Sequence, residues 1–142
     1  MEPKPHEPTK HQYDFDSAAC IALIRKAGLE NEIHLNIEVN HATLSGHNFE
    51  HEIAYAISNN ALGSLDINRG DSLLGWDTDQ FPNNAADLLI AFYFIYSNGG
   101  LGSGGLNFDA VIIADFDESL KCVGTSLLYT DVSPRNKYFI TL

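Results

Sequence analysis

One stretch decides the fold class of this chain: Ile33-His34-Leu35-Asn36-Ile37-Glu38-Val39. Apolar and polar residues alternate along it with a period of two, which is typical of a β-strand with one buried face. Upstream, apolar residues at helical spacing run to about Lys26, and Gly28 follows as a typical helix end. Asp16 or Ser17 can cap the start of that segment. A helix therefore precedes the strand.

The same rhythm repeats downstream. Helices are predicted over 49–57 and 85–96, and strands over 62–66 and 106–109. Strands that alternate with helices favour βα units and a parallel sheet. The rhythm stops after Ala110, so we predict a βα part over 1–110 and a divergent tail over 111–142.

Composition narrows the class of partner. The 142 residues carry a formal net charge of −11, which argues against a nucleic-acid-binding face. An acidic balance is compatible with cation binding, although a solvated acidic surface gives the same count. The two cysteines make no disulfide framework, and Cys20 is predicted to be a buried small hydrophobe. No signal peptide or membrane-spanning run is visible, so a cytoplasmic protein without membrane or nucleic-acid partners is expected.

Four carboxylates stand near the ends of strand-like or extended segments. They are Glu2, Glu38, Asp66 and Asp109. In a parallel barrel the carboxyl ends of the strands gather around one site, so these side chains are expected to converge. Carboxylates a few Å apart repel one another unless one takes up a proton or a divalent cation lies between them. This pattern therefore predicts a cation-binding site.

Three more residues fit the same site. Asp77 and Asp79 can point the same way if their segment is extended, and His41 adds an imidazole three residues after Glu38. A set rich in oxygen favours Mg²⁺, and one nitrogen also suits Mn²⁺ or Co²⁺. Each residue taken alone is more simply a turn, capping or surface residue. Their joint placement favours the metal site.

Two other features of the sequence carry no functional assignment. The run Gly100-Leu101-Gly102-Ser103-Gly104-Gly105 matches a dinucleotide fingerprint in letters, but it follows a helix and opens a strand, which is the reverse of the required order. It is predicted to be a tight connection with positive φ angles. His47 and His51 can share one face of a helix start, and no role is assigned to them.

Several motifs together resemble the class II xylose isomerases. The first part of the resemblance runs from Glu2 to Asp16, with Glu2-Pro3-Lys4-Pro5-His6 at its start. Then come Asn36-Ile37-Glu38-Val39-Asn40-His41, Asp66-Ile67-Asn68-Arg69-Gly70-Asp71, Gly75-Trp76-Asp77-Thr78-Asp79, and the stretch from Gly99 to Ala110. The order and spacing of these motifs make the resemblance specific over about residues 1–110.

This resemblance implies a fold, two metal ions and a reaction. The fold would be part of a (β/α)₈ TIM barrel, from the end of strand five to strand eight, with two divalent cations. The first ion would be held by Glu2, Glu38, Asp66 and Asp109, and the second by Glu38, His41, Asp77 and Asp79. Lys4 would contact the open-chain sugar. The reaction would be the interconversion of D-xylose and D-xylulose by a hydride shift, with D-glucose as a further substrate.

The chain also departs from that family. The resemblance implies that strands one to four are absent, together with a histidine–aspartate pair and half of the sugar pocket, so the chain is expected to be a truncated, inactive piece. Association into a homo-oligomer is one remedy for exposed strand edges, and the family forms tetramers. The alternative is a non-catalytic metal-binding or interaction remnant of the same lineage.

Overall fold

The computed structural model describes residues 1–6, 13–71 and 77–110 of the chain. Parts of two quoted motifs (7–12 and 72–76), the tail (111–142) and Cys122 lie outside the described residues. The described elements follow one another as α1 (Ser17–Ala27), β1 (Leu35–Glu38), α2 (Val39–Leu44), α3 (Phe49–Ser58), β2 (Leu62–Asp66), α4 (Ala86–Ser97) and β3 (Leu106–Asn107).

The first helix has the caps that its sequence predicts. The Asp16 side chain accepts a hydrogen bond from the Ala19 backbone N–H at 2.8 Å. Such a cap satisfies one of the backbone donors that a helix start leaves open. At the other end Gly28 adopts a left-handed conformation with φ of 72°, which glycine tolerates without strain. The predicted helix over 17–26 is therefore confirmed.

The three strands form one parallel sheet in the order β1-β2-β3. Glu38 lies opposite Asp66 in the pairing of β1 with β2, and Asp66 lies opposite Asn107 in the pairing of β2 with β3. The N-terminal segment runs beside β1: the Met1 ammonium donates to the His34 carbonyl, and the Asn36 N–H donates to the Met1 carbonyl. The predicted parallel α/β arrangement is confirmed for the described residues.

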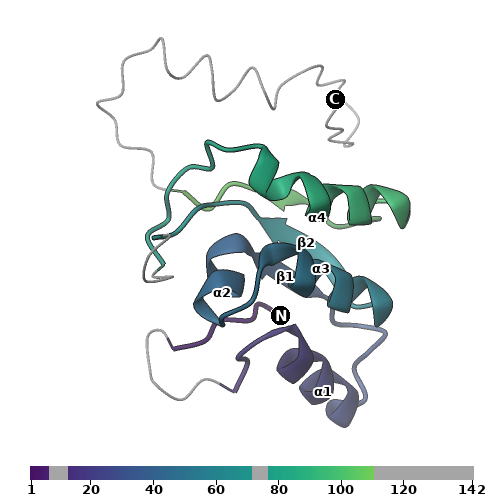
Figure 1. Cartoon of the computed structure of the whole chain (residues 1–142). Helices are drawn as coiled ribbons and strands as arrows, with labels where there is room; N and C mark the ends of the chain where they lie inside the picture. The colour runs from purple at the N-terminus through teal and green to yellow at the C-terminus, as the bar shows by residue number, and fades with distance from the viewer. Residues whose placement is uncertain (7–12, 72–76, 111–142) are drawn as a thin grey trace. The chain divides into compact units, whose positions relative to one another are not determined.

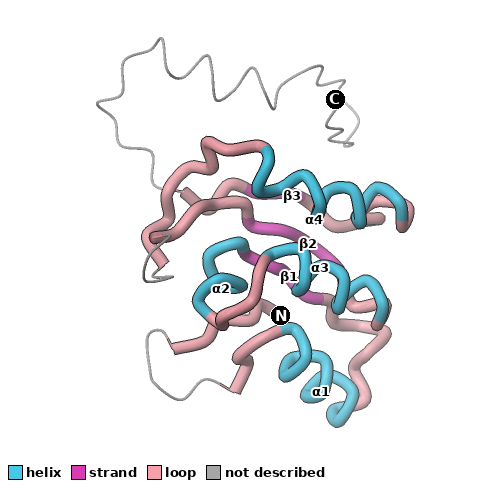
Figure 2. The backbone as a smooth tube through the Cα atoms, in the orientation of Figure 1, coloured by secondary structure: helices cyan, strands magenta, loops and turns pink. Residues whose placement is uncertain are grey.

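Helices α1, α3 and α4 form a layer against this sheet. Figure 1 and Figure 2 show α3 between α1 and α4, in front of β1 and β2, and contacts join α3 to both helices and both strands. The core between the layers contains Ile53, Leu35 and Leu65, all fully buried, and the fully buried Cys20 confirms its predicted packing role. None of the described helices is long and apolar enough to cross a membrane.

The register gives the sheet two chemically different faces. Side chains alternate sides along a strand, so the paired residues Ile37 and Leu65 point toward the helices. Asn36, Glu38 and Asp66 then point to the opposite face, and the hydrogen bond between Asn36 and Asp66 places them together there. One side of the sheet is thus core, and the other side carries the acidic residues.

Two elements differ from prediction. Val39 was expected to continue the strand, but it begins α2, a short helix with Glu38 in the N-cap position. Tertiary contacts hold this turn. The Asn40 N–H donates to the Asn68 side chain at 3.0 Å, and Asn40 is completely buried. The strand predicted over 106–109 is shorter than expected, since β3 ends at Asn107.

The glycine run before β3 is a tight connection, as predicted. Gly99, Gly100 and Gly102 have positive φ angles of 90°, 85° and 62°. Gly104 serves a different purpose: a Cβ built there would lie 1.7 Å from the Gly63 carbonyl oxygen. The absence of a side chain at Gly104 is what lets this connection approach the start of β2.

We expect Gly104→Ala to destabilise the protein by about 2 kcal/mol, because a methyl group cannot fit without a shift of backbone. Urea denaturation followed by circular dichroism measures the change. Gly105→Ala is the matched control, since a Cβ at Gly105 would meet nothing within 4 Å. Equal stability of the two variants would contradict the close approach of Gly104 to Gly63.

Candidate metal centre

The acidic residues lie at one end of the sheet because the strands are parallel. Glu38 and Asp66 are the last residues of β1 and β2, and Asp109 follows β3 by two residues. The carboxyl ends of parallel strands meet at one edge, where binding sites of α/β sheets form. Glu2 reaches the same place, since its segment pairs with β1 and its carboxylate accepts a hydrogen bond from Asn36.

Glu38 is the buried member of this set. Its side chain is 1% exposed, and its Oε1 accepts a hydrogen bond from the Asn68 side chain at 2.5 Å. The other oxygen, Oε2, is buried without a hydrogen-bond partner among the described residues. Burial raises the pKa of Glu38 to about 8, Asn68 opposes that rise, and Asp77 and nearby carboxylates add to it.

His41 lies between three carboxylates. Its Nε2 is 3.3 Å from Glu38 Oε2 and 3.2 Å from Asp77 Oδ2, and its Nδ1 is 3.3 Å from Glu2 Oε1. Burial lowers the pKa of His41, and the Lys4 ammonium lowers it further, against the pull of Glu2 and Asp77. A neutral imidazole retains a lone pair, which is the form that binds a metal ion.

Asp77 and Asp79 share a hydrogen bond beside Lys4. The Lys4 ammonium donates to Asp77 Oδ2 at 2.7 Å, and the Asn40 side chain donates to Asp77 Oδ1 at 2.8 Å. Burial alone would raise the pKa of Asp77, but hydrogen bonds with Lys4 and Asp79 outweigh it and the net pKa is lowered. Burial and the hydrogen bond to Asp77 raise the pKa of Asp79 to about 6. Asp79 is thus the member of the pair that takes up a proton first as the pH falls.

The donor atoms fall into two groups that share one residue. In each group the atoms lie within 4.8 Å of one another: Glu2, Glu38 and His41 in one, and Glu38, Asp79 and Asp109 in the other. The shared residue is Glu38, to which the resemblance also gives the bridging role. The remaining membership differs from the implied one, because His41 groups with Glu2, and Asp109 groups with Asp79.

Asp66 and Asp77 belong to neither group. Asp66 accepts hydrogen bonds from Asn36 at 2.7 Å and from Asn107 at 3.3 Å. Asp77 accepts hydrogen bonds from the side chains of Lys4 and Asn40, and its Oδ2 lies 3.2 Å from His41 Nε2. Hydrogen-bond donors thus hold both carboxylates at the edge of the cluster.

The sequence reasoning missed the amide side chains that hold the carboxylates. They are Asn36, Asn40, Asn68 and Asn107. The period of two could have revealed Asn36, which lies on the same face of β1 as Glu38. Asn68 stands two residues after Asp66 and is 1% exposed, which was not visible from its type alone.

These residues fit a divalent cation. Several carboxylates and one imidazole converge, and the buried Glu38 Oε2 and His41 Nδ1 have no hydrogen-bond partner among the described residues. A cation would satisfy both atoms and would offset the burial and the carboxylate repulsion that raise the pKa of Glu38. The oxygen-rich set suits Mg²⁺, Mn²⁺ or Co²⁺. This defines the class: a parallel α/β protein with a carboxylate-rich candidate metal centre at the carboxyl edge of its sheet.

Comparison with known proteins gives the family. The chain is 60% identical over 112 residues to the xylose isomerase of Listeria welshimeri, a match that covers 79% of this chain and 26% of that protein. It is 59% identical over 110 residues to that of Ruegeria pomeroyi, covering 78% and 25%. With the enzyme of Bacillus cereus it shares 58% identity over 119 residues, covering 83% and 27%.

Over this matched segment the chain is homologous to these xylose isomerases. It spans about a quarter of the length of the curated relatives that it matches. No protein-family model matches the chain.

Proposed function

We propose that this chain carries the divalent-metal centre of a xylose isomerase. The observation that supports this most directly is Glu38, a buried carboxylate that belongs to both groups of potential ligands. A buried carboxylate with one oxygen that accepts no hydrogen bond among the described residues is costly in a protein that binds no cation there. The identity to proteins named xylose isomerase supports the same reaction, the interconversion of D-xylose and D-xylulose.

The proposed centre holds two divalent cations, Mg²⁺ or alternatively Mn²⁺ or Co²⁺. Bound ions would act as Lewis acids toward the oxygens of the sugar and ease a hydride shift between its first two carbons. The proposed ligands are Glu2, Glu38, His41, Asp66, Asp77, Asp79 and Asp109. Asn36 and Asn107 hold Asp66 in place, and Asn68 orients Glu38.

Lys4 is the proposed catalytic residue that contacts the sugar. Its ammonium is 2.7 Å from Asp77, and its side chain remains 31% exposed, so it can reach a molecule at the edge of the sheet. There it would supply positive charge where an oxyanion develops on the substrate. The hydrogen bond to Asp77 restricts where that charge lies.

The described residues supply one side of such a site. They form three parallel strands and their covering helices, whereas the proposed complete fold is a closed (β/α)₈ barrel around the sugar. We therefore propose that this chain by itself binds ions without turning over sugar, and that isomerisation needs the rest of a barrel from another polypeptide or another copy. The alternative is a metal-binding module without catalysis in any assembly.

An assay for ketose formation separates these functions. We expect no ketose from D-xylose with the chain alone and Mg²⁺, Mn²⁺ or Co²⁺. Ketose should form when the chain is co-expressed with the part of the Listeria welshimeri enzyme that it does not match. Lys4→Met should reduce that rate by at least about 100-fold, because an electrostatic stabiliser of the transition state is lost.

Glu30→Gln, which changes an exposed carboxylate, is the matched control for the same assay. Its rate in the co-expressed sample should equal that of the unsubstituted chain. If no ketose forms in that sample although both parts are folded and bound to each other, the metal-binding module is the better account.

A further inference from the structure

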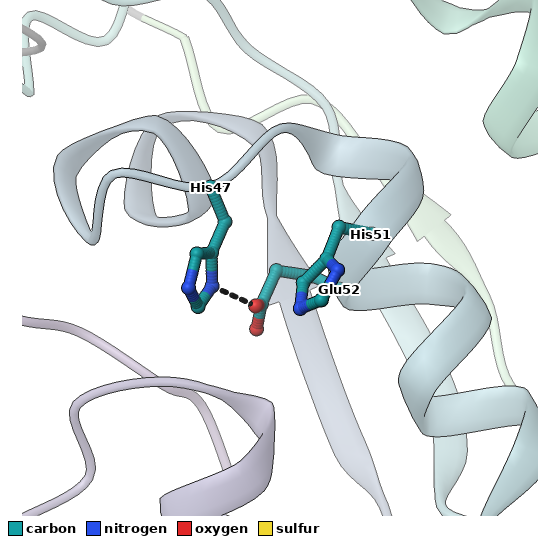
Figure 3. Close-up of side chains that lie close together, drawn as sticks. All are labelled: His47, His51 and Glu52. Carbon is teal, nitrogen blue, oxygen red and sulfur yellow. Dashed lines mark hydrogen bonds and ion pairs between the residues drawn. The ribbon is translucent and has the colours of Figure 1, made fainter.

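A second cluster of potential ligands lies at the start of α3 and shares no residue with the proposed metal centre. It consists of His47, His51 and Glu52, which Figure 3 shows close together. The two imidazole rings have centroids 4.6 Å apart, and one ligand atom from each of the three residues lies within 4.8 Å of the others. We call these residues the α3 cluster.

The local backbone fixes two members of the α3 cluster. The Asn48 side chain caps α3 and accepts a hydrogen bond from the His51 N–H at 3.0 Å. His51 and Glu52 therefore stand in the first turn of a capped helix. His47 precedes the cap, four residues before His51, so its ring reaches back toward the same turn.

Glu52 is a buried member of the α3 cluster and not a solvated surface charge. Its side chain is 3% exposed, and its Oε2 accepts the backbone N–H of Ser17, the first residue of α1, at 2.8 Å. Its Oε1 lies 2.5 Å from His47 Nδ1, as the dashed line in Figure 3 shows. Glu52 is thereby held with one oxygen toward α1 and the other toward the histidines.

We propose that the α3 cluster binds a borderline divalent transition ion, with Zn²⁺ as its representative. Two imidazoles and one carboxylate form a set that suits Zn²⁺ far better than Mg²⁺, which prefers oxygen ligands and retained water. A tetrahedral Zn²⁺ site has ligand atoms roughly 3.3 Å apart, given bonds of about 2.0–2.1 Å. Small side-chain rotations bring atoms within 4.8 Å to that spacing.

The ion would take the place of the hydrogen bond between His47 and Glu52. When Zn²⁺ binds, a neutral His47 would carry its proton on Nε2 instead of Nδ1, so that His47 Nδ1 and Glu52 Oε1 both become ligands. His51, which is exposed, would supply the third ligand, and water would fill the open position. A purely structural role for the His47–Glu52 contact makes the opposite prediction, namely that no ion binds here.

Isothermal titration of the full chain with Zn²⁺ tests the proposal, in a buffer with excess Mg²⁺ to occupy the oxygen-rich centre. We expect a Zn²⁺ site whose affinity falls about tenfold or more in His51→Ala and in His51→Gln, since loss of even an indirect metal contact weakens binding by 10–100-fold. Because His51 is exposed, both variants should keep the circular dichroism spectrum of the unsubstituted chain. If His51→Ala has a lower melting temperature, the affinity of His51→Gln decides the result.

Two control variants locate the site. His34→Ala removes an exposed histidine outside the α3 cluster and should leave Zn²⁺ affinity unchanged. Glu38→Gln damages the proposed catalytic metal centre and should also leave it unchanged. Equal Zn²⁺ affinity in the unsubstituted chain and His51→Gln would overturn the proposal, and loss of binding in Glu38→Gln would assign the ion to the other centre. Neither result depends on isomerase activity, so this inference can fail while the proposed function stands.

Discussion

In metal-free buffer at pH 8, Glu38→Gln should be more stable than the unsubstituted chain. Its free energy of unfolding should be larger by on the order of 4 kcal/mol. Burial raises the pKa of Glu38 from 4.5 to about 8, so the folded protein resists the ionisation that the unfolded chain undergoes freely. Glutamine has no proton to lose and can still accept the hydrogen bond from Asn68. The substitution therefore removes the penalty and keeps the contact.

The same pKa fixes the sign and range of the pH dependence. Between pH 4.5 and 8 the folded state holds a proton on Glu38 that the unfolded state has lost, so stability falls as the pH rises. His41, with its lowered pKa, acts in the opposite direction, but only below its unfolded value of 6.5. The destabilising effect of Asp79 is essentially complete above its folded pKa of about 6. From pH 6.5 to 8 the slope therefore belongs mainly to Glu38, and the loss should be ~2 kcal/mol.

Urea denaturation in EDTA at pH 6.5 and pH 8 measures this loss. Glu38→Gln should show a nearly flat profile, and the control Glu30→Gln, which changes an exposed carboxylate, should keep the slope of the unsubstituted chain. A pH profile with the same slope in the unsubstituted chain and Glu38→Gln would mean that Glu38 is solvated and ionised in the folded protein.

Mn²⁺ should stabilise the folded chain by about 2.7 kcal/mol at 100 times its dissociation constant, provided that it binds only the folded state. For a domain of this size the melting temperature would rise by about 10 °C. The physical reason is the set of carboxylates around Glu38, which exists only when the three strand ends are brought together. Differential scanning calorimetry at pH 7.5 with and without Mn²⁺ measures the shift.

Glu38→Gln should abolish most of that shift, because it removes the ligand that both donor groups share. Glu30→Gln should melt and respond to Mn²⁺ like the unsubstituted chain. Identical melting temperatures with and without Mn²⁺ in the unsubstituted chain would refute the metal centre. The sequence similarity to xylose isomerases would stand, but this chain would bind no ion.

Together, these two results would describe one carboxylate with opposite effects. Without a cation, Glu38 weakens the fold as the pH rises, and with a cation it strengthens the fold. One substitution, Glu38→Gln, should raise stability in EDTA and remove the gain from Mn²⁺. A buried carboxylate that binds no cation would show the first effect, which follows from burial alone, and not the second.

The sequence by itself determined the order of the strands and of helices α1, α3 and α4, but not α2. Alternation over 33–39, helical spacing over 17–26 and the caps at Asp16 and Gly28 are local patterns, and they indicate their elements within a few residues. Because the alternation of strands and helices implies a parallel sheet, the sequence also placed Glu38 and Asp66 at one edge.

Only the tertiary structure decided how that edge is organised. Val39 turns into α2 because Asn40 bonds to Asn68, a residue 28 positions away. The amides that hold the carboxylates, the sharing of Glu38 by two donor groups, and the burial of Glu52 against Ser17 likewise depend on contacts between separate elements. A local pattern indicates which face a side chain lies on, whereas its hydrogen-bond partners and its pKa depend on residues that only folding brings near.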